Sequence, residues 1–495
     1  MNGRPHEWHP GVLILFILFI LFILSCSSRP SSSSSSGASA AAVAAAPTGI
    51  PPGADAFLDD LQRRTFRWFW ETTNPANGLT PDRHPRRDFS SVAAVGFALT
   101  AYPIGAERGW VTREQARDRV LTTLRFFWRL PQGSQPAGIG GYRGFFYHFL
   151  DMETGHRFRT VELSTIDTSL LLGGVLFCRE YFDRASDAAE AEIRALADSL
   201  YFRADWAWAR ARPPAVSMGW HPEEGGAFIR ADWVGYDEAM LLYVLALGSP
   251  THPLELDAWQ RWTSGYKWAE PYGQPHVYFG PLFGHQYSHL WVDFRGIRDE
   301  YMRGKGIDYF ENSRRATLAQ RAYAIENPGA WKGYGADVWG ITASDGPGDT
   351  AFAVDGRRRQ FFSYSARGPA SMGDRDDGTL APTAVGGSVP FAPEVTIRAL
   401  MAMRERYPAI YNQYGFVDAF NPTWPAEVKP REGGVAPGVG YVDTDQLGID
   451  QGPIIAMIEN HRSELVWKMM RKSPYIRRGL ERAGFTGGWL AGSSR

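Results

Sequence analysis

Residues 162–182 read Glu-Leu-Ser-Thr-Ile-Asp-Thr-Ser-Leu-Leu-Leu-Gly-Gly-Val-Leu-Phe-Cys-Arg-Glu-Tyr-Phe, a short loop with two acids followed by an apolar segment. Apolar residues recur at helical spacing from Asp167 to Phe182, so this segment is predicted to be a helix. The same pattern, an acid-bearing loop that enters an apolar helix, recurs along the chain. Both the fold and the candidate site are predicted from it.

Helical periodicity continues on both sides of this segment. The stretch 238–247 is followed by Gly248-Ser249-Pro250, a combination that ends helices. The other predicted helices span residues 57–69, 92–99, 116–127, 188–201, 288–302, 312–325, 393–406 and 450–470. Strand-like segments are few and local, and they predict two hairpins, 144–150 with 157–162 and 206–209 with 216–220.

Many helices with short hairpins between them are typical of a closed ring of helix pairs. No alternation of strands and helices is found, so a doubly wound sheet or a TIM barrel is not expected. A helical solenoid remains an alternative, although the sequence has no fixed repeat period.

The N-terminal residues carry a predicted export signal. Arg4 precedes an apolar run, residues 11–24, that is too short to span a bilayer comfortably and suits a secretory signal. The run ends in Ile23-Leu24-Ser25-Cys26, the relaxed form of a lipoprotein cleavage site. Acylated Cys26 would anchor the protein, and Ser27 favours the outer membrane; an ordinary cleaved signal or an uncleaved anchor is the alternative.

The predicted organisation is therefore a signal peptide (1–25), a tether rich in Ser, Ala, Pro and Gly (26–54), and one large domain (55–490). Composition does not change sharply after the tether, which favours one domain over several. Cys178 is the only other cysteine, and its apolar surroundings predict a small core residue.

Charge and motifs exclude several functions. The formal net charge is −1 and no basic stripe occurs, so nucleic acid is not an expected partner. No Walker loop, dinucleotide motif or G-x-S-x-G elbow is found. Asp443-Thr444-Asp445 opens like a calcium loop, but Leu447 and Ile454 occupy ligand positions and exclude an EF-hand.

Zinc is a weak possibility. His285 and His289 have the spacing of a zinc pair, but Gln286 stands where a zincin has its glutamate, so sugar contact or a buried hydrogen-bonded pair is preferred. We expect no cofactor and no metal, and no obligate protein partner is evident.

What remains is a set of carboxylates beside aromatic residues and glycines, including 18 Trp in the chain. Glycoside hydrolysis needs two carboxyl groups, one protonated and one ionised. Acids occur at the mouths of five predicted loops: Glu223-Glu224 after Trp220, Glu162 with Asp167, Asp237-Glu238 after Trp233, Asp345 after Trp339, and Asp450. Asp167 could instead cap its helix, whereas Glu162 has no capping role.

The sequence resembles the glycoamylase-like family of bacterial exported proteins, which is related to the endo-β-1,2-glucanases of glycoside hydrolase family 144. Stretches that carry the resemblance run in family order over nearly all of the mature chain: residues 91–97, 144–151, 162–168, 247–253, 281–289, 291–295, 339–346, 377–379, 414–421 and the loop at Asp450. The resemblance implies an all-α fold, an (α/α)6 barrel or toroid with a few short β-hairpins at the cleft side. It also implies hydrolysis of a glucan, with β-1,2-glucan the preferred substrate.

An inverting mechanism is expected, with carboxyl groups roughly 6.5–9.5 Å apart. Glu224 is the predicted general acid, and Glu162 or Asp167 the group that positions water. The predicted sugar contacts are Asp345, Asp450, His148, His285, His289, Asp293 and Arg295, with Trp220, Trp233 and Trp339 as stacking platforms. For Asp293 and Arg295, a buried ion pair is an equal alternative.

Other functions stay open. An α-1,4-glucan is the second substrate, and a non-catalytic carbohydrate-binding lipoprotein of the outer membrane is the alternative outside enzymes. A polysaccharide lyase is disfavoured, because lyases need basic side chains and these loops are acidic.

Overall fold

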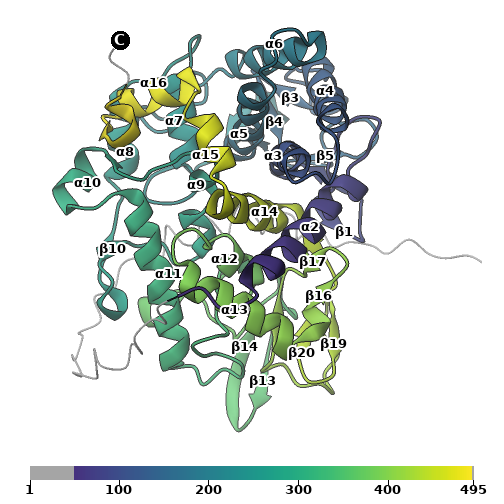
Figure 1. The fold of residues 1–495 in the computed structure, drawn as a ribbon, viewed down its shortest axis with the longest axis vertical. Helices are drawn as coiled ribbons and strands as arrows, with labels where there is room; N and C mark the ends of the chain where they lie inside the picture. The colour runs from purple at the N-terminus through teal and green to yellow at the C-terminus, as the bar shows by residue number, and fades with distance from the viewer. Residues whose placement is uncertain (1–48, 493–495) are drawn as a thin grey trace, which may run out of the picture. The chain divides into compact units, whose positions relative to one another are not determined.

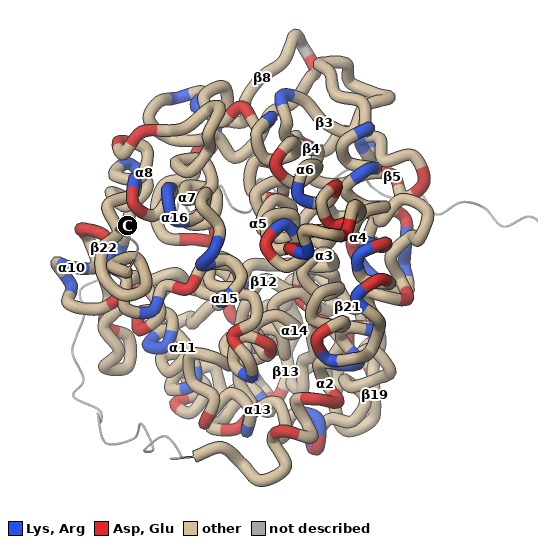
Figure 2. The backbone as a smooth tube through the Cα atoms, turned by 45° about the horizontal axis from the view of Figure 1, so that its top comes forward, with Lys and Arg blue, Asp and Glu red and all other residues tan. Residues whose placement is uncertain are grey.

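The computed structural model describes residues 49–492 (Figure 1). The predicted signal peptide, Cys26 and nearly all of the tether lie outside the described residues. Within the described part, no helix is long and apolar enough to span a membrane. Lys and Arg are interspersed with Asp and Glu on outer helices such as α4 and α13 (Figure 2).

The described chain is mostly helical. The helices are α2 (Ala54–Thr72), α3 (Val92–Glu107), α4 (Arg113–Arg129), α5 (Thr165–Tyr181), α6 (Ala188–Phe202), α7 (Met240–Gly248), α8 (Leu256–Thr263), α9 (Tyr287–Trp291), α10 (Glu300–Lys305), α11 (Tyr309–Glu326), α12 (Pro382–Gly386), α13 (Pro393–Arg406), α14 (Gly448–Arg462), α15 (Leu465–Met470) and α16 (Pro474–Arg482). They are joined by short strands and loops, so the strands contribute only small sheets.

Helix α5 shows why these segments fold as they do. Ser164 is its N-cap and accepts a hydrogen bond from the Asp167 amide, which satisfies a donor left free in the first turn. Nearly all of α5 is buried, and Cys178 within it is a core residue whose thiol donates to the Leu99 carbonyl. Asp167 is therefore not the cap, and its carboxylate is available for another role.

Helices α3 and α5 lie against each other at two glycines. A Cβ added at Gly174 would stand 2.1 Å from the Gly96 carbonyl oxygen, so only glycine allows this approach. The two backbones therefore touch directly in the interior of the protein.

The first and last parts of the described chain pack together. Helix α14 lies against α2 and α3 (Figure 1). Gln62 on α2 donates hydrogen bonds to the Ile455 carbonyl (3.1 Å) and to Glu459 Oε2 (2.7 Å) on α14.

The largest sheet carries part of the candidate site. Its order is β3 (Gly141–Tyr142), β4 (Phe145–Tyr147), β6 (Leu163–Ser164), β7 (Gly219–His221) and β8 (Ala227–Phe228), all antiparallel. Leu163 pairs with Trp220, and the His148 amide donates to the Glu162 carbonyl (3.0 Å). This register brings the segments of His148, Glu162 and Trp220 side by side.

The other strands form small antiparallel sheets. The three-stranded sheet has the order β18 (Phe420–Asn421), β20 (Gly440–Val442) and β19 (Gly434–Ala436). The pairs are β1 (Arg83–His84) with β21 (Gln446–Leu447), β2 (Phe89–Ser91) with β5 (Phe149–Asp151), β9 (Trp268–Ala269) with β10 (His276–Val277), β11 (Ile297–Arg298) with β22 (Thr486–Gly487), β12 (Ala343–Ser344) with β15 (Ser365–Ala366), β13 (Thr350–Val354) with β14 (Arg357–Phe361), and β16 (Tyr411–Asn412) with β17 (Gly415–Phe416).

The structure confirms one predicted hairpin and corrects the other, together with two predicted helices. Segments 144–150 and 157–162 pair as predicted: Leu150 forms an antiparallel bridge with Arg157, and the His148 amide donates to the Glu162 carbonyl. In the second predicted hairpin, strand β7 pairs with β6 and β8 instead of with segment 206–209.

The segment 288–302 contains α9, β11 and α10 instead of one helix, because Gly296 adopts a left-handed conformation (φ 73°) between them. The segment 450–470 is split into α14 and α15, with Glu464 at φ 60° between them.

Candidate active site

A histidine lies between two acids at the centre of the largest sheet. His148 Nδ1 is 2.8 Å from Glu162 Oε1, and its Nε2 is 3.6 Å from Asp167 Oδ1. Both carboxylates are mostly buried, and Asp167 Oδ2 also accepts a hydrogen bond from Ser164 Oγ (2.5 Å). The sequence predicted all three residues as members of the site, and the structure brings them together.

The charges in this group depend on one another. Burial alone would lower the pKa of His148, but the Asp167 and Glu162 carboxylates outweigh burial and raise the pKa to about 9. The imidazole is therefore protonated at neutral pH. Burial raises the pKa of Asp167, whereas the charged His148 and the Ser164 hydroxyl act in the opposite direction.

Glu238 is a buried acid close to this group. It lies just before α7, is 7% exposed, and its carboxylate is close enough to feel the charges of Asp237 and Asp167. Burial and then these two acids raise the pKa of Glu238 well above its ordinary value. A carboxylic acid that stays protonated at neutral pH has the property required of a general acid.

Neither of the two acids before α7 caps the helix, because its N-cap is Ala239 and has no side-chain cap. Asp237 Oδ1 accepts hydrogen bonds from the Ala239 amide (2.9 Å) and from Trp262 Nε1 (3.3 Å). Capping therefore does not explain Glu238. The sequence showed Glu238 within an aromatic-Gly-acid motif, but did not place it among the predicted site residues.

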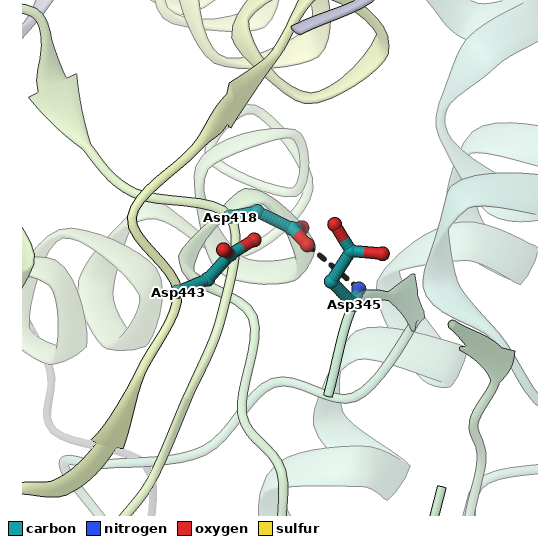
Figure 3. A group of neighbouring side chains, drawn as sticks. All are labelled: Asp345, Asp418 and Asp443. Atoms are coloured by element: carbon teal, nitrogen blue, oxygen red, sulfur yellow. Dashed lines mark hydrogen bonds between the residues drawn. The ribbon is translucent and has the colours of Figure 1, made fainter. Parts of the chain in front are cut away.

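A second group of acids contains Asp345, Asp418 and Asp443 (Figure 3). They are 4%, 1% and 2% exposed, and one carboxylate oxygen of each lies within 4.8 Å of the others. Asp418 Oδ2 accepts a hydrogen bond from the Asp345 amide (2.7 Å). Of the three, the sequence predicted only Asp345 as a site residue.

Asp450 adjoins this second group, and its carboxyl group hydrogen-bonds that of Asp418. Burial raises the pKa of Asp450 to about 7. Burial and neighbouring carboxylates also raise the pKa values of Asp418 and Asp443 well above the ordinary value. Such a concentration of buried acid binds protons unless positive charge offsets it.

Arg83 supplies positive charge on one side of the second group. Its guanidinium donates to Asp345 Oδ2 (2.7 Å) and to Asp82 Oδ2 (3.0 Å), and it lies 3.7 Å from Asp445. Strand β1 positions Arg83 by pairing it with Leu447, just before α14. Neither Arg83 nor Asp82 was predicted from the sequence.

The two groups of acids influence the same side chains. The Asp450, Glu238 and Asp418 carboxylates all contribute to the raised pKa of the Tyr287 hydroxyl, after burial as the largest cause. Asp82, the partner of Arg83, contributes in turn to the raised pKa of His148. The acids around His148 and those around Asp418 thus share one electrostatic environment.

The predicted stacking residues are buried. The exposed fractions of Trp220, Trp233 and Trp339 are 6%, 2% and 0%. Trp220 stacks on Tyr142 with ring centroids 5.0 Å apart, and Trp233 Nε1 donates to Thr165 Oγ1 (3.0 Å). The rings of Trp233 and Trp339 are therefore core residues, which corrects the prediction that they offer flat faces to a sugar.

His285 and His289 also lie in the core. Both are 0% exposed; His285 Nε2 is 3.2 Å from the Phe279 carbonyl oxygen, and His289 Nε2 is 3.1 Å from Ser313 Oγ. Burial lowers the pKa of both, to about 3 for His289, so both are neutral. Of the two preferred interpretations of these histidines, the structure supports buried hydrogen bonding and not contact with sugar.

Asp293 and Arg295 form the ion pair that was the alternative to sugar contact. Their side chains are 2.8 Å apart, Asp293 is 1% exposed, and Arg471 also contacts it. Arg295 further pairs with Glu464 (2.8 Å). These residues connect the segment before β11 to α15.

Glu224 lies in a short 3-10 helix, Glu223–Gly225, directly after β7. Its side chain lies outside what the structure describes, so its assignment as general acid stays a prediction. The neighbouring Glu223 pairs with Arg157 (2.6 Å).

Comparison with known proteins identifies the family. The glycoamylase model, described as “Putative glucoamylase”, matches residues 230–474. A solved structure from Bacteroides uniformis with the same description is 30% identical, covers 89% of this chain and 100% of its own chain, and has a TM-score of 0.75. The chain belongs to the glycoamylase family. The resemblance seen in its sequence is thereby confirmed.

Two relatives of this glycoamylase-family chain have named activities. An endo-β-1,2-glucanase from Chitinophaga pinensis, solved with sophorotriose and glucose, is 28% identical, with 88% of this chain and 99% of that chain covered and a TM-score of 0.73. An exo-β-1,2-glucooligosaccharide sophorohydrolase from Parabacteroides distasonis is 29% identical over 471 residues, 88% of this chain. This chain spans only 58% of that curated relative.

Proposed function

We propose that this protein is a glycoside hydrolase that cleaves β-1,2-glucan with inversion at the anomeric carbon. The observation that carries the proposal is similarity over 88% of the chain to two proteins named for action on β-1,2-linked glucose, at 28% and 29% identity. The buried acids of the candidate site supply the two kinds of carboxyl group that the reaction needs.

The proposed architecture is an (α/α)6 barrel. Support comes from the mostly helical chain, the small sheets, and the packing of α14 against α2, which joins the two ends of the domain. In such a ring, the first turns of α5 and α14 and the loop before α7 would place Asp167, Asp450 and Glu238 on one side.

Glu238 is the proposed general acid. Its carboxyl group is kept protonated by burial and by the nearby Asp237 and Asp167. It would give its proton to the glycosidic oxygen as the bond to the anomeric carbon breaks. Glu224, the acid expected from the sequence, remains the second candidate.

Asp167 is the proposed base, with Glu162 as the alternative within the same group. The protonated His148 lies between them, and its charge acts against burial to lower the pKa of Asp167. An ionised Asp167 would remove a proton from water as the water oxygen attacks the anomeric carbon from the opposite face. His148 is a positioning residue in this scheme, because it acts through the two acids.

Asp345 and Asp450 are proposed to bind sugar hydroxyl groups. Carboxyl oxygens accept hydrogen bonds from hydroxyls, and Asp450 has an oxygen, Oδ2, with no partner among the described residues. Arg83 would orient Asp345 through their 2.7 Å contact.

The experiment that tests the function is a screen of the purified protein on linear β-1,2-, β-1,3- and α-1,4-glucans, with product anomers followed by NMR. We expect α-anomeric products from β-1,2-glucan alone. Release from α-1,4-glucan would favour the second substrate. Binding of oligosaccharide without release from any glucan would exclude the enzyme and leave a carbohydrate-binding protein.

Export and lipid anchoring are also proposed, from residues 1–26 alone. Residues 1–25 would be removed as a lipoprotein signal, and acylated Cys26 would hold the protein at the outer membrane, in the periplasm or at the cell surface. Mass spectrometry of the N-terminal peptide tests this. A diacylated Cys26 is expected in the wild type. The Cys26→Ala variant cannot carry these acyl chains, so it should be released from the membrane fraction.

A further inference from the structure

Three buried carboxyl groups meet although they come from distant segments. Asp345 follows β12, Asp418 lies between β17 and β18, and Asp443 follows β20. Figure 3 shows their side chains directed toward one another. One oxygen from each lies within 4.8 Å of the others.

Hydrogen bonds within the protein satisfy only part of this group. Asp418 Oδ2 accepts from the Asp345 amide (2.7 Å), and Asp443 Oδ1 accepts from the Asp445 amide (3.2 Å). Asp418 Oδ1 and Asp443 Oδ2 are inaccessible to solvent and have no partner among the described residues. A buried oxygen without a partner requires an explanation, such as an ordered water or an ion.

Two buried side chains outside the group lie close to it. Tyr441 is 0% exposed, and its hydroxyl has no partner within the described chain although the charges of Asp443, Asp345 and Asp418 all act on it. Asp450, 4% exposed, hydrogen-bonds Asp418 and keeps its Oδ2 without a partner. Among the described residues, Asp443 Oδ2 in this group and the Tyr441 hydroxyl therefore lack a hydrogen-bond partner.

Charge distinguishes an ion from a water. Arg83 contacts Asp345 but is shared with Asp82 and Asp445. One guanidinium cannot neutralise Asp345, Asp418, Asp443 and Asp450 together with its other partners. A bound cation would offset the carboxylates that Arg83 does not reach, whereas a water would satisfy only their hydrogen bonds.

We propose that Asp345, Asp418 and Asp443 bind a divalent cation, with Ca²⁺ the best match. The donors are all oxygens, which suits hard cations. Ca²⁺ tolerates flexible coordination by protein oxygens, whereas Mg²⁺ usually keeps several waters, so a buried group of carboxylates favours Ca²⁺. The ion would hold three chain segments together beside Asp450. This structural role goes beyond the proposed hydrolysis.

The test uses Tb³⁺ as a luminescent stand-in for Ca²⁺, on protein stripped of metal with a chelator. Excitation of aromatic side chains should produce Tb³⁺ emission, because Tyr441 adjoins the site, and Ca²⁺ should compete for it. We expect Asp443→Asn and Asp418→Asn to weaken Tb³⁺ and Ca²⁺ binding at least tenfold. Ca²⁺ should also raise the thermal unfolding midpoint of the wild type.

The matched control is Asp337→Asn, which removes an acid whose contact, with Arg406, is long (3.9 Å). It should bind Tb³⁺ as the wild type does. Equal Tb³⁺ emission from wild type and Asp443→Asn, or no emission from wild type, would overturn the proposal. If the variants fail to fold, wild-type crystals soaked in TbCl₃ decide the matter: anomalous density among the three carboxylates supports the site, and its absence contradicts it.

Discussion

His148 Nδ1 lies 2.8 Å from Glu162 Oε1, and the same imidazole reaches Asp167 on its other side. Glu162 and Asp167 stand at the two ends of the segment that contains β6 and the first turn of α5. A single protonated ring therefore holds together two buried acids of the proposed active site. The stability of this arrangement depends on that proton.

The first prediction concerns the pH dependence of stability. The pKa of His148 rises from an ordinary 6.5 to about 9 on folding, so its contribution is fully present below pH 6.5 and is lost as pH rises through 9. The loss should be on the order of 3 kcal/mol. Urea unfolding of wild type and His148→Gln between pH 6 and 10 measures it. If the free energy of unfolding changed with pH equally in the two proteins, the role of His148 would be contradicted.

The second prediction concerns the general acid. Glu238→Gln keeps the shape of the side chain but cannot donate the proton, so kcat on β-1,2-glucan should fall roughly 10²- to 10⁴-fold with little change in folding. In the wild type, activity should decline at alkaline pH as Glu238 loses its proton, because its pKa is raised.

The control for that experiment is Asp237→Asn, in which the amide oxygen can still accept the hydrogen bond from the Ala239 amide. It should retain far more activity than Glu238→Gln. If Glu224→Gln loses activity and Glu238→Gln does not, the general acid is Glu224.

The third prediction concerns a buried ion pair. The side chains of Arg367 and Asp377 are both 0% exposed and lie 2.8 Å apart. Replacing Arg367 by Met leaves a buried carboxylate without its partner and should cost about 3–5 kcal/mol in the free energy of unfolding. Arg125→Ala, which breaks the exposed pair with Glu192, should cost less than about 1 kcal/mol. If the two variants lost similar amounts of unfolding free energy, burial of the Arg367–Asp377 pair would not be the reason for its strength.

The fourth prediction concerns the contact between α3 and α5. Gly174→Ala places a methyl group 2.1 Å from the Gly96 carbonyl oxygen, so the helices must separate, at a cost of about 1–3 kcal/mol or more. Gly304→Ala in α10 is the matched control, since nothing lies within 4 Å of its Cβ. It should be neutral or slightly stabilising. Chemical denaturation of both variants measures the difference.

Sequence periodicity predicted helices best where residues that start or end helices flank the apolar pattern. Segment 393–406 matches α13 in both bounds, and the Gly248-Ser249-Pro250 signal correctly ends α7 at Gly248. Periodicity failed in segment 288–302, where the apolar spacing continues through a left-handed turn that a single glycine makes possible. Helix α16 was missed although its apolar and charged faces are distinct.

The candidate site was predicted in part for a similar reason. His148 directly follows β4, Glu162 directly precedes β6, and Asp167 lies in the first turn of α5, so all three come from one short stretch of sequence and could be predicted from it. Asp418 and Asp443 meet Asp345 only through folding over long sequence distances, and no local spacing reveals that contact. Burial of the tryptophans was equally hidden, because an aromatic ring beside Gly and Asp has the same local pattern in a core as in a binding cleft.

The hydrogen bond between Gln62 and Glu459 spans 397 positions of the chain. During synthesis, α2 leaves the ribosome long before its partner α14 exists, so the domain cannot complete its fold until almost the entire polypeptide has been made. Contacts of this separation slow folding and prolong the time spent unfolded. Such a delay would suit the export proposed above, since a narrow membrane channel passes only an unfolded chain.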